Sequence, residues 1–540
     1  MKKQIGFIII VLFAAVMRLW HLDSLSYGFA NDEISYIYSS YTIWKTSGHD
    51  ISGKFLPLSI NLDSSLSPTP VYIGAPFVGI FGLSPFTGRL PFALAGIGSV
   101  ILVYLLADLL FQNKMIASLS GFVMVFSPWN TVINRGAWDG NMGVFFYLLG
   151  TYLLLKGLRK GTILWSIPAF LLAFYSYHAM KVFLVSFVPI LIFLYYKQLL
   201  QRKQQLFLFI FLCFTILASF FLVTITQGVS REEVLAWKDP KNIEQVTKQV
   251  NYFREKSSAP TLLKDIVTNK VTILASSMID NYLGAFSMQH LFITGDISPV
   301  YTYGIFFKGV LYIIEFPLLL FGIIFLAKKT SKQTALTVAA GLFCAPLSSA
   351  IGSGTTYIIR ALLMVPFFSI IIGSGIFYAF EISKKNKILF LITTATIIIG
   401  YVVCIGLFLY RYLFQFNGAG NEFWNASSRT VATEIKENYA MYDHVYVSGS
   451  DDKFLLQFVF WNQIDPNLFQ KVWQTGGVRK IGKVTFLPDC IAGIGDPHAF
   501  LPKKSLYLIR STCTINAAPD ETITDRLEPL QVLWRIYEKK

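Results

Sequence analysis

Charged side chains are scarce in this 540-residue chain. Only 14% of its residues are Asp, Glu, Lys or Arg, 54% are hydrophobic, and the mean hydropathy is +0.54. A composition this apolar excludes a soluble protein of this size. Apolar runs recur along the whole sequence, and several approach the roughly 20 residues that cross a bilayer. Because lipid offers no partner to unpaired backbone groups, these runs predict a bundle of membrane-spanning helices.

Histidine and cysteine are also rare, with six and five residues. The histidines show no ligand spacing, so they predict no histidine-held metal site. Three cysteines lie in apolar runs, where buried thiols are ordinary. The other two, Cys490 and Cys513, lie in the polar C-terminal region. They can form a disulfide if that region is extracytoplasmic.

Acidic residues are outnumbered by basic ones, which gives a net charge of +15. A nucleic-acid partner is one explanation of such a charge. The Lys and Arg residues, however, sit in short clusters between apolar runs, where they set membrane topology. No nucleic-acid module is recognisable, so we expect a bilayer and no nucleic acid as partner.

Eleven apolar segments are predicted to span the membrane. The first, residues 5–20, does not read as a cleaved signal peptide, because no small-residue cleavage site follows it. The other ten are residues 88–111, 115–129, 142–157, 163–179, 182–196, 206–225, 303–327, 334–350, 356–380 and 388–412. Residues 70–82 are also apolar, but 13 residues with two prolines are short for a span.

The basic clusters decide whether residues 70–82 cross the membrane. With eleven spans and a cytoplasmic N-terminus, every basic linker falls on the cytoplasmic side, as the positive-inside rule requires. These linkers are residues 112–114, 156–160, 197–205, 328–332 and 384–387. A twelfth span would place them all outside. Residues 70–82 are therefore predicted to be an interfacial or re-entrant piece.

This topology predicts two domains in a multi-pass protein of the cell membrane. Residues 1–412 form the transmembrane domain, whose outer face carries long loops at 21–87 and 226–302. Residues 413–540 form a small extracytoplasmic α/β domain with a helix at about 452–463. Its predicted strands are residues 444–448, 483–487, 505–509 and 531–537.

Acidic residues at the outer boundary are candidates for chemistry, because carboxylates are costly near hydrocarbon and mark functional sites there. Asp32 and Glu33 follow the first span. The alternative is a helix start, with Asn31 as the cap and the acids complementing the helix dipole. In the next outer loop Arg135 and Asp139 are four residues apart, and an ion pair within an interfacial helix is the alternative there.

Two cations stand at outer ends of spans, against the topology rule. Lys181 follows His178 closely, and Arg360 precedes the run Ala-Leu-Leu-Met-Val-Pro. A cation at this boundary suits a phosphate or pyrophosphate, and Arg offers a bidentate grip. The alternative for each is a side chain that snorkels at a helix end.

The order of these motifs resembles the C-type glycosyltransferase superfamily, and in particular the branch of protein O-mannosyltransferases and lipid A aminoarabinose transferases. The matching motifs are residues 31–33, 88–91, 127–129, 135–139 and 360–366. The resemblance covers residues 1–225 and 340–412. One departure is Asn31, where the family more often has an apolar residue or proline.

The resemblance implies an inverting, single-displacement transfer of a sugar from a polyprenyl-phosphate carrier on the extracytoplasmic face. Asp32 then matches the base, with Glu33 as helper or substrate ligand and Asp139 as a second acidic group. The candidates for contact with the phosphate or substrate are Arg135, His178, Lys181, Arg360 and Arg89. A carboxylate beside an apolar boundary is a stronger base, because desolvation disfavours its charged form.

The resemblance favours no metal cofactor, although the three carboxylates could hold a divalent ion as in the oligosaccharyltransferases. The acceptor stays open between a lipid, a protein and a cell-envelope polymer. The competing interpretations are a multi-pass transporter or lipid flippase, and a non-catalytic scaffold. Transporters usually show two similar halves and helices broken at mid-membrane, whereas this sequence shows no halves and its candidate charges lie at the outer boundary.

Overall fold

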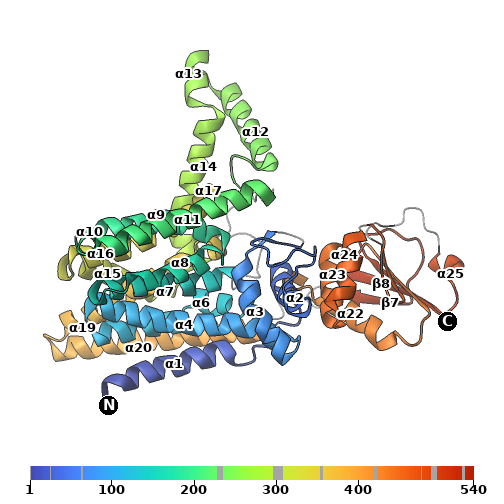
Figure 1. Ribbon diagram of the computed structural model, residues 1–540, viewed down its shortest axis with the longest axis horizontal. Coiled ribbons are helices and arrows are strands. Elements are labelled where there is room, and N and C mark those ends of the chain that lie inside the picture. The colour runs from blue at the N-terminus through green and yellow to red at the C-terminus, as the bar shows by residue number, and fades with distance from the viewer. Residues whose placement is uncertain are drawn as a thin grey trace. The chain divides into compact units, whose positions relative to one another are not determined.

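The structure is a computed structural model that describes residues 2–24, 26–62, 65–227, 235–295, 308–352, 357–416, 422–475, 477–487, 490, 496–525 and 530–540. The chain divides into two compact units (Figure 1). The first, here the helical unit, comprises Met1–Trp20, Phe92–Arg135 and Asp139–Leu409. The second, here the sheet unit, comprises His21–Pro91, Gly136–Trp138 and Tyr410–Lys540.

Within the described residues, five helical stretches are long and apolar enough to cross a membrane. They are α4 (Pro85–Phe111), α7 (Asp139–Lys160), Lys332–Ile351 with α16 (Lys332–Cys344) and α17 (Leu347–Ile351), Leu362–Ser383 with α19 (Val365–Ser383), and Lys387–Gln415 with α20 (Lys387–Tyr410). The protein is therefore a multi-pass membrane protein of mainly helical structure.

The remaining predicted spans correspond to six other helices. They are α1 (Lys2–Leu19), α5 (Lys114–Phe126), α8 (Ser166–Phe174), α9 (His178–Leu194), α11 (Lys203–Gln227) and α15 (Glu315–Lys329). Each lies within a few residues of its predicted segment except α15, which begins well inside the predicted segment 303–327. Residues 303–307 lie outside the described residues. The total of eleven spans stays a prediction.

The late start of α15 has a local cause. The Glu315 carboxylate accepts a hydrogen bond from the backbone N–H of Tyr312 at 2.8 Å and another from the hydroxyl of Tyr401 at 3.1 Å. Glu315 is 1% exposed. A carboxylate that takes up a backbone N–H three residues earlier fixes the helix start at this point. A hydropathy profile contains no information on these hydrogen bonds, so it does not predict the late start of α15.

A bend separates α5 from α6 (Pro128–Asn134), and the two helices differ in direction by 59°. Pro128 has no backbone N–H to continue α5, and the Ser127 hydroxyl accepts a hydrogen bond from the backbone N–H of Asn130. Helix α6 ends at Asn134, and α7 begins at Asp139. The alternative of one interfacial helix carrying both Arg135 and Asp139 is therefore wrong.

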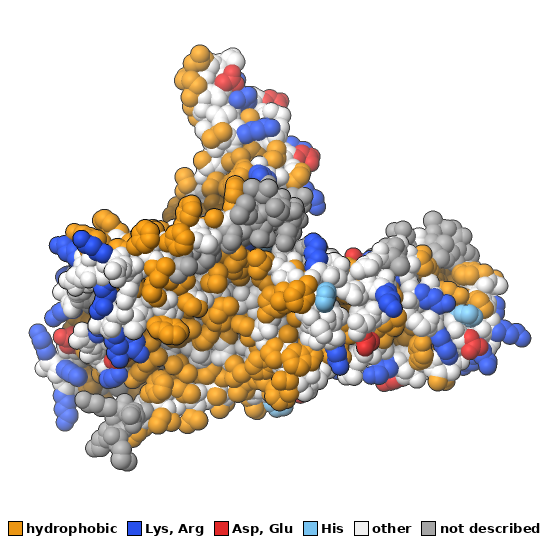
Figure 2. All heavy atoms as spheres, viewed as in Figure 1, with side chains coloured by type: hydrophobic (Ala, Val, Ile, Leu, Met, Phe, Trp, Pro, Cys, Tyr) orange, Lys and Arg blue, Asp and Glu red, His pale blue; other side chains and the backbone are white. Residues whose placement is uncertain are grey.

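The basic linkers of the helical unit gather at one end. A single cavity is lined by the link between α4 and α5, the end of α7, α10 (Tyr196–Leu200) and the link between α15 and α16. Lys329 also lies 3.9 Å from Glu381 near the end of α19. Figure 2 shows Lys and Arg side chains collected at this end of the helices. The predicted topology requires the basic linkers to lie at the same end of the helices.

The predicted loop 226–302 is partly helical, as expected. It contains α12 (Pro240–Lys256), α13 (Thr261–Val267) and α14 (Lys270–Gly284). Asn269 caps α14 by accepting hydrogen bonds from the backbone N–H groups of Val271 and Thr272. Residues 228–234 and 296–302 of this loop lie outside the described residues.

The sheet unit begins with two packed helices, α2 (Asn31–Lys45) and α3 (Pro68–Phe81), which flank a hairpin of β1 (Ile60–Asn61) and β2 (Ser65–Leu66). Helix α3 covers most of the predicted interfacial piece and has 14 residues, fewer than a span needs. A side chain at Gly79 would lie 2.1 Å from the Trp44 ring, so the glycine permits α3 to approach α2 closely.

The C-terminal part is a six-stranded sheet with the order β4-β5-β3-β6-β8-β7. Strand β3 pairs in parallel with β5 and β6, and the other pairs are antiparallel. The strands are β3 (His444–Ser448), β4 (Arg479–Ile481), β5 (Val484–Leu487), β6 (Ser505–Arg510), β7 (Glu521–Thr524) and β8 (Val532–Lys539). The helices are α22 (Ala426–Asn438), α23 (Asp452–Trp461), α24 (Pro466–Thr475) and α25 (Pro497–Phe500).

The predicted α/β class of this part is confirmed, as are its four strands and the helix α23. The short strands β4 and β7 and the helices α22 and α24 were not predicted. β4 has only three residues, and β7 carries no buried residue, so neither shows the apolar alternation that marks a strand in a sequence.

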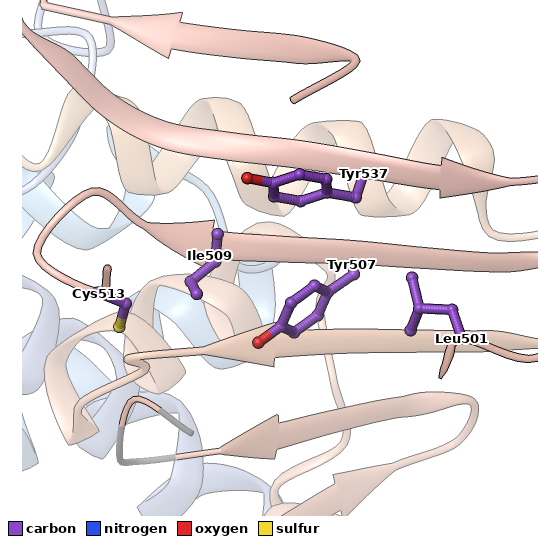
Figure 3. Close-up of a cluster of buried hydrophobic side chains, with 5 residues drawn as sticks. All are labelled: Leu501, Tyr507, Ile509, Cys513 and Tyr537. Carbon is purple, nitrogen blue, oxygen red and sulfur yellow. The ribbon is translucent and has the colours of Figure 1, made fainter. Parts of the chain in front are cut away.

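One face of the sheet buries the cluster of Leu501, Tyr507, Ile509, Cys513 and Tyr537 (Figure 3). Tyr507 and Ile509 lie two residues apart on β6 and so face the same side, and Tyr537 is the register partner of Tyr507 on β8. Cys513 forms a disulfide with Cys490. The sequence left this pairing open, and the structure shows that the bond ties Cys490 to this core.

Candidate active site

The acidic pair lies in the first turn of α2. Ala30 is the N-cap, with extended backbone, and Asn31 is already the first helical residue. The prediction that Asn31 caps the helix is therefore wrong, because a capping side chain must come from the residue before the first helical one. The Asn31 side-chain oxygen instead accepts a hydrogen bond from the amide of Asn425 at 3.0 Å.

Glu33 is fully buried and forms an ion pair with Arg89 of α4. The Arg89 guanidinium donates from Nε to Oε1 at 2.7 Å and from Nη2 to Oε2 at 3.1 Å, which is the bidentate arrangement. The same carboxylate accepts the backbone N–H of Ala137 at 3.2 Å. Both oxygens of Glu33 are thus engaged inside the protein.

The remaining donors of Arg89 hold the chain that leads into α2. Nη1 donates to the carbonyl of Leu22 at 3.1 Å, and Nη2 donates to the hydroxyl of Ser26 at 2.6 Å. The guanidinium also lies 4.9 Å from the centre of the Phe29 ring. Removing one member of such a buried pair typically costs about 3–5 kcal/mol, because the other charge stays buried without compensation.

This geometry bears on two of the predicted roles. Arg89 is 2% exposed and its donors already meet a carboxylate, a hydroxyl and a carbonyl, which favours a positioning role over the predicted contact with phosphate. Glu33 is equally unsuited to touch a substrate. Its burial fits the predicted role of helper, acting through the position of α2.

Asp32 faces a different direction from its neighbour. Successive residues of a helix point about 100° apart around the axis, so the burial of Glu33 turns Asp32 toward the outside. Asp32 is exposed. The two carboxylates therefore have separate tasks, since Glu33 anchors the helix start and Asp32 is presented by it.

The C-terminal part of the sheet unit holds the same helix start from another side. The Phe29 carbonyl accepts hydrogen bonds from the amides of Asn425 at 2.8 Å and Gln457 at 3.0 Å. The Phe29 ring lies between Phe460, at 4.7 Å, and Trp461, at 5.3 Å. The sequence offered no signal for these contacts, because nearly 400 residues or more separate the partners.

Gly28 makes this approach possible. A Cβ atom at this position would lie 1.9 Å from the backbone carbonyl oxygen of Trp424, which is far inside van der Waals contact. Backbone cannot yield as the end of a side chain can. Gly28 is thus required by the close packing of the first loop against the residues that precede α22.

A cavity of about 500 Å³ opens beside this network in the sheet unit. Ser26 joins the two, since it lines the cavity and accepts the hydrogen bond from Arg89. The Arg429 guanidinium lies between the rings of Tyr27, at 4.3 Å, and Trp461, at 4.2 Å. The full lining is Asp23, Ser24, Ser26, Tyr27, Ser84, Pro85, Phe86, Arg429 and Trp461.

Arg135 belongs to the helical unit and closes the end of α1. It follows α6 directly, is 6% exposed, and donates to the carbonyls of Met17 at 2.9 Å and Trp20 at 2.6 Å. These carbonyls lie at the C-terminal end of α1, where no helical partner is left for them. The arrangement favours a structural role for Arg135 over the predicted contact with phosphate.

His178 and Lys181 are brought together in the first turn of α9. The Lys181 amine lies 3.4 Å from Nδ1 of His178 and 5.9 Å from the centre of the Phe174 ring. The first turn of α9 contains no acidic residue. A cation at the positive end of a helix dipole is unfavourable by itself, and an anionic ligand would offset that.

Asp139 and Arg360 stand on helices that meet the start of α9. Asp139 opens α7 and is half-buried, and its carboxylate accepts the backbone N–H of Gly140. Arg360 ends α18 (Tyr357–Arg360), next to residues 353–356, which lie outside the described residues. The hydroxyl of Tyr177, just before α9, donates to the carbonyl of Ile359 at 3.2 Å.

The close approach of these helices is visible at Gly140. A Cβ atom there would lie 3.6 Å from the Ile359 side chain and 3.7 Å from the Tyr177 ring. The starts of α7 and α9 and the short helix α18 are therefore neighbours. The helical unit thus brings the elements that carry Asp139, His178, Lys181 and Arg360 close together.

Comparison with protein families supports the resemblance seen in the sequence. Residues 65–222 match the family described as dolichyl-phosphate-mannose-protein mannosyltransferase. Two similar proteins come from Bacillus subtilis (strain 168). "Putative mannosyltransferase YkcB" is 43% identical over 91 residues, which are 17% of this chain and 13% of that protein. "Putative mannosyltransferase YycA" is 30% identical over 139 residues, which are 25% of this chain and 20% of that protein. The chain thus spans a fifth or less of the length of these relatives.

Similarity to solved structures extends over nearly the whole chain. Apo ArnT from Cupriavidus metallidurans matches with a TM-score of 0.53 and 12% identity, over 94% of this chain and 93% of that one. The same protein bound to undecaprenyl phosphate matches with a TM-score of 0.54 and 11% identity, over 99% of this chain and 98% of that one. The chain has the fold of a C-type glycosyltransferase.

The family match covers some of the candidate site residues and not others. The matched family region contains α4, α7 and α9, and so includes Arg89, Asp139 and Lys181. Asp32 and Arg360 lie outside it. The comparisons establish the fold and the resemblance, whereas the roles of the individual site residues stay predictions that rest on the geometry above.

Proposed function

We propose that this protein is a membrane glycosyltransferase that moves a sugar from a polyprenyl-phosphate carrier to an acceptor, with inversion. The observation that carries the proposal is the exposed Asp32 on a helix start fixed by the buried pair of Glu33 and Arg89. The match to ArnT bound to undecaprenyl phosphate and the similarity to mannosyltransferases support this donor class. Nothing in the comparisons supports the transporter alternative.

In the proposed step, the Asp32 carboxylate takes the proton of the acceptor hydroxyl or amine. The acceptor atom then attacks the anomeric carbon, the bond from that carbon to the carrier phosphate breaks, and the polyprenyl phosphate leaves with the electron pair. Lys181 and Arg360 stabilise the charge on the departing phosphate, and Asp139 orients the acceptor or the base. A preorganised cation at such a group is worth about 3 kcal/mol or more in the transition state.

We further propose that Asp32 and the sheet unit face the extracytoplasmic side. The disulfide between Cys490 and Cys513 supports this, because disulfides persist in oxidising compartments. The basic linkers at one end of the helical unit support a cytoplasmic location for that end. Modification of a single introduced cysteine by an impermeant reagent in intact cells would test each side.

We propose that the transfer needs no metal cofactor. The phosphate is already a good leaving group, and Lys181 and Arg360 supply the counter-charge in this mechanism. Transfer in the presence of excess EDTA should equal transfer in its absence. A loss that Mg²⁺ or Mn²⁺ restores would contradict this part of the proposal and leave the donor class intact.

The deciding experiment is transfer of a labelled sugar from polyprenyl phosphate by the reconstituted protein, comparing wild type with Asp32→Asn. We expect transfer to fall about 10²–10⁴-fold, the range for loss of a general base, while the unfolding temperature stays unchanged. Asp443→Asn is the matched control, because Asp443 is an exposed aspartate of the same unit and lies next to β3. Undiminished transfer by Asp32→Asn would remove Asp32 from the mechanism.

A further inference from the structure

Two adjoining cavities open at the end of the helical unit where the basic linkers lie. Their volumes are about 470 and 400 Å³, and both are lined by Leu109, Gln112 and Arg159. We call them together the basic basin, defined by its basic wall residues Lys156, Arg159, Lys160 and Lys329. The basin lies between the ends of α4, α7, α10 and α15, and so at the opposite end of α7 from Asp139.

The charge of the basin is positive. Its single acidic wall residue is Asp108, and the Lys114 amine already pairs with that carboxylate. Lys329 lies 3.9 Å from Glu381, but both side chains are largely exposed, so this contact is weak. Concave walls of one sign concentrate counter-ions of the other sign, and the basin therefore favours an anion.

Two helices also begin at the basin. Asn113 caps α5 by accepting hydrogen bonds from the backbone N–H groups of Met115 and Ile116, and Ser331 caps α16 by accepting one from Thr334. Asn113, Ser331 and Thr334 line the larger cavity. The positive ends of two helix dipoles thus add to the four basic side chains.

Arg159 is held in place at the junction of the two cavities. Its Nη2 donates to the carbonyl of Leu109 in the last turn of α4 at 3.0 Å. This bond fixes the guanidinium beside both cavities and uses only part of the donors of the side chain. An anion that enters the basin meets a cation that needs little ordering.

Gln198 lines the larger cavity. The Gln198 side chain donates weakly to the Gln333 side-chain oxygen at 3.5 Å. Its own oxygen, Oε1, is buried and has no hydrogen-bond partner among the residues that the structure describes. A buried acceptor without a donor is costly, so a ligand that brings a hydroxyl to this point is favoured.

We propose that the basic basin binds the headgroup of an anionic phospholipid that carries a free hydroxyl, of the phosphatidylglycerol class. The phosphate would meet Arg159, Lys329 and the two helix starts, and a glycerol hydroxyl would donate to Gln198. Basic pockets between membrane helices are typical headgroup sites. A role in topology alone explains the Lys and Arg residues, but it explains neither the concave shape nor the buried oxygen of Gln198.

The test is lipid binding by the purified full-length protein in detergent micelles, counted by native mass spectrometry. The probes are phosphatidylglycerol, phosphatidic acid, which lacks the glycerol headgroup, and phosphatidylcholine. The variant Arg159→Gln with Lys329→Gln should bind phosphatidylglycerol about tenfold more weakly or worse, and phosphatidylcholine as wild type does. The control, Lys384→Gln with Lys385→Gln, removes the same charge from the same end outside the basin and should keep wild-type affinity.

Equal loss of phosphatidylglycerol binding in the two double variants would overturn the proposal. It would show that binding depends on the general positive potential of this end of the protein. Unchanged binding in the basin variant would overturn it as well. Gln198→Leu should abolish the preference for phosphatidylglycerol over phosphatidic acid, and a retained preference would contradict the hydroxyl contact. Competition by glycerol 3-phosphate would show that a soluble headgroup suffices, and its absence would assign the site to the lipid. These readings do not depend on sugar transfer.

Discussion

The start of α2 and the start of α9 both carry charge beside an apolar helix, but they compensate it differently. At α2 the carboxylate of Glu33 meets Arg89 inside the protein, and the pair has almost no exposure. At α9 the cation Lys181 lies at the positive end of its own helix, and the first turn has no acid. The Lys181 amine lies 3.4 Å from Nδ1 of His178.

The difference separates structural charge from functional charge. A buried pair such as Glu33 and Arg89 fixes a backbone position, because its hydrogen bonds are satisfied only in one arrangement. A cation placed against its helix dipole is stabilised only by something that the helix does not supply. The comparison therefore favours positioning for Glu33 and Arg89, and the contact of Asp32, Lys181 and Arg360 with substrates stays a proposal.

We expect the largest loss of stability when one member of the buried pair is removed. Arg89→Met should lower the free energy of unfolding by about 3–5 kcal/mol, because the Glu33 carboxylate would stay buried without its partner. Thermal unfolding of the purified protein, followed by circular dichroism, measures the loss.

The control for that prediction removes both charges. Arg89→Met combined with Glu33→Gln should recover part of the lost stability, since no uncompensated charge remains. If the single variant is as stable as wild type and yet loses donor binding, Arg89 contacts the phosphate and the positioning role is wrong.

Substitution of Lys181 tests the role of the charge at the start of α9. Lys181→Met should reduce sugar transfer about 100-fold with little change in stability, because the proposed task of this cation is to stabilise the leaving phosphate. Lys181→Arg, which keeps the charge, should recover part of the activity. A stability loss that accounts for the activity loss would instead place Lys181 with the structural charges.

Substitution of Asn425 should have the smallest effect on stability. It tests how firmly the start of α2 is held. Asn425→Ala removes hydrogen bonds to the Phe29 carbonyl and the Asn31 side chain, so the free energy of unfolding should fall by about 1–2 kcal/mol. If α2 positions Asp32, kcat should fall more than KM rises. Asn467→Ala, at an exposed Asn with local hydrogen bonds only, is the control.

Much of the fold followed from patterns that are local in the sequence. Apolar runs identified α4, α5, α7, α9, α16 and α20 within a few residues, and alternating β-rich runs identified β3, β5, β6 and β8. The exceptions have local causes that composition does not show. The carboxylate of Glu315 delays α15, and Pro128 breaks the chain between α5 and α6 so that Arg135 and Asp139 lie on different helices.

The candidate site was predicted as a set of residue types and only in part as an arrangement. Charges at the outer boundary identified Asp32, Lys181 and Arg360, because such residues are unfavourable there without a function. The same reasoning selected Arg89 and Arg135, which the structure places in internal hydrogen bonds. It could not find Asn425 or Gln457, whose partners in the first loop are nearly 400 or more residues away.

The sequence alone thus determined that the chain is a multi-pass helical membrane protein with an α/β domain, because hydropathy and strand periodicity are local properties. It also predicted which charges stand at the membrane boundary. Only the tertiary structure decided that Glu33 and Arg89 compensate one another. Adjacent carboxylates look equivalent in a sequence, but packing buries Glu33 against Arg89 and leaves Asp32 exposed, since neighbouring residues of a helix face different surroundings.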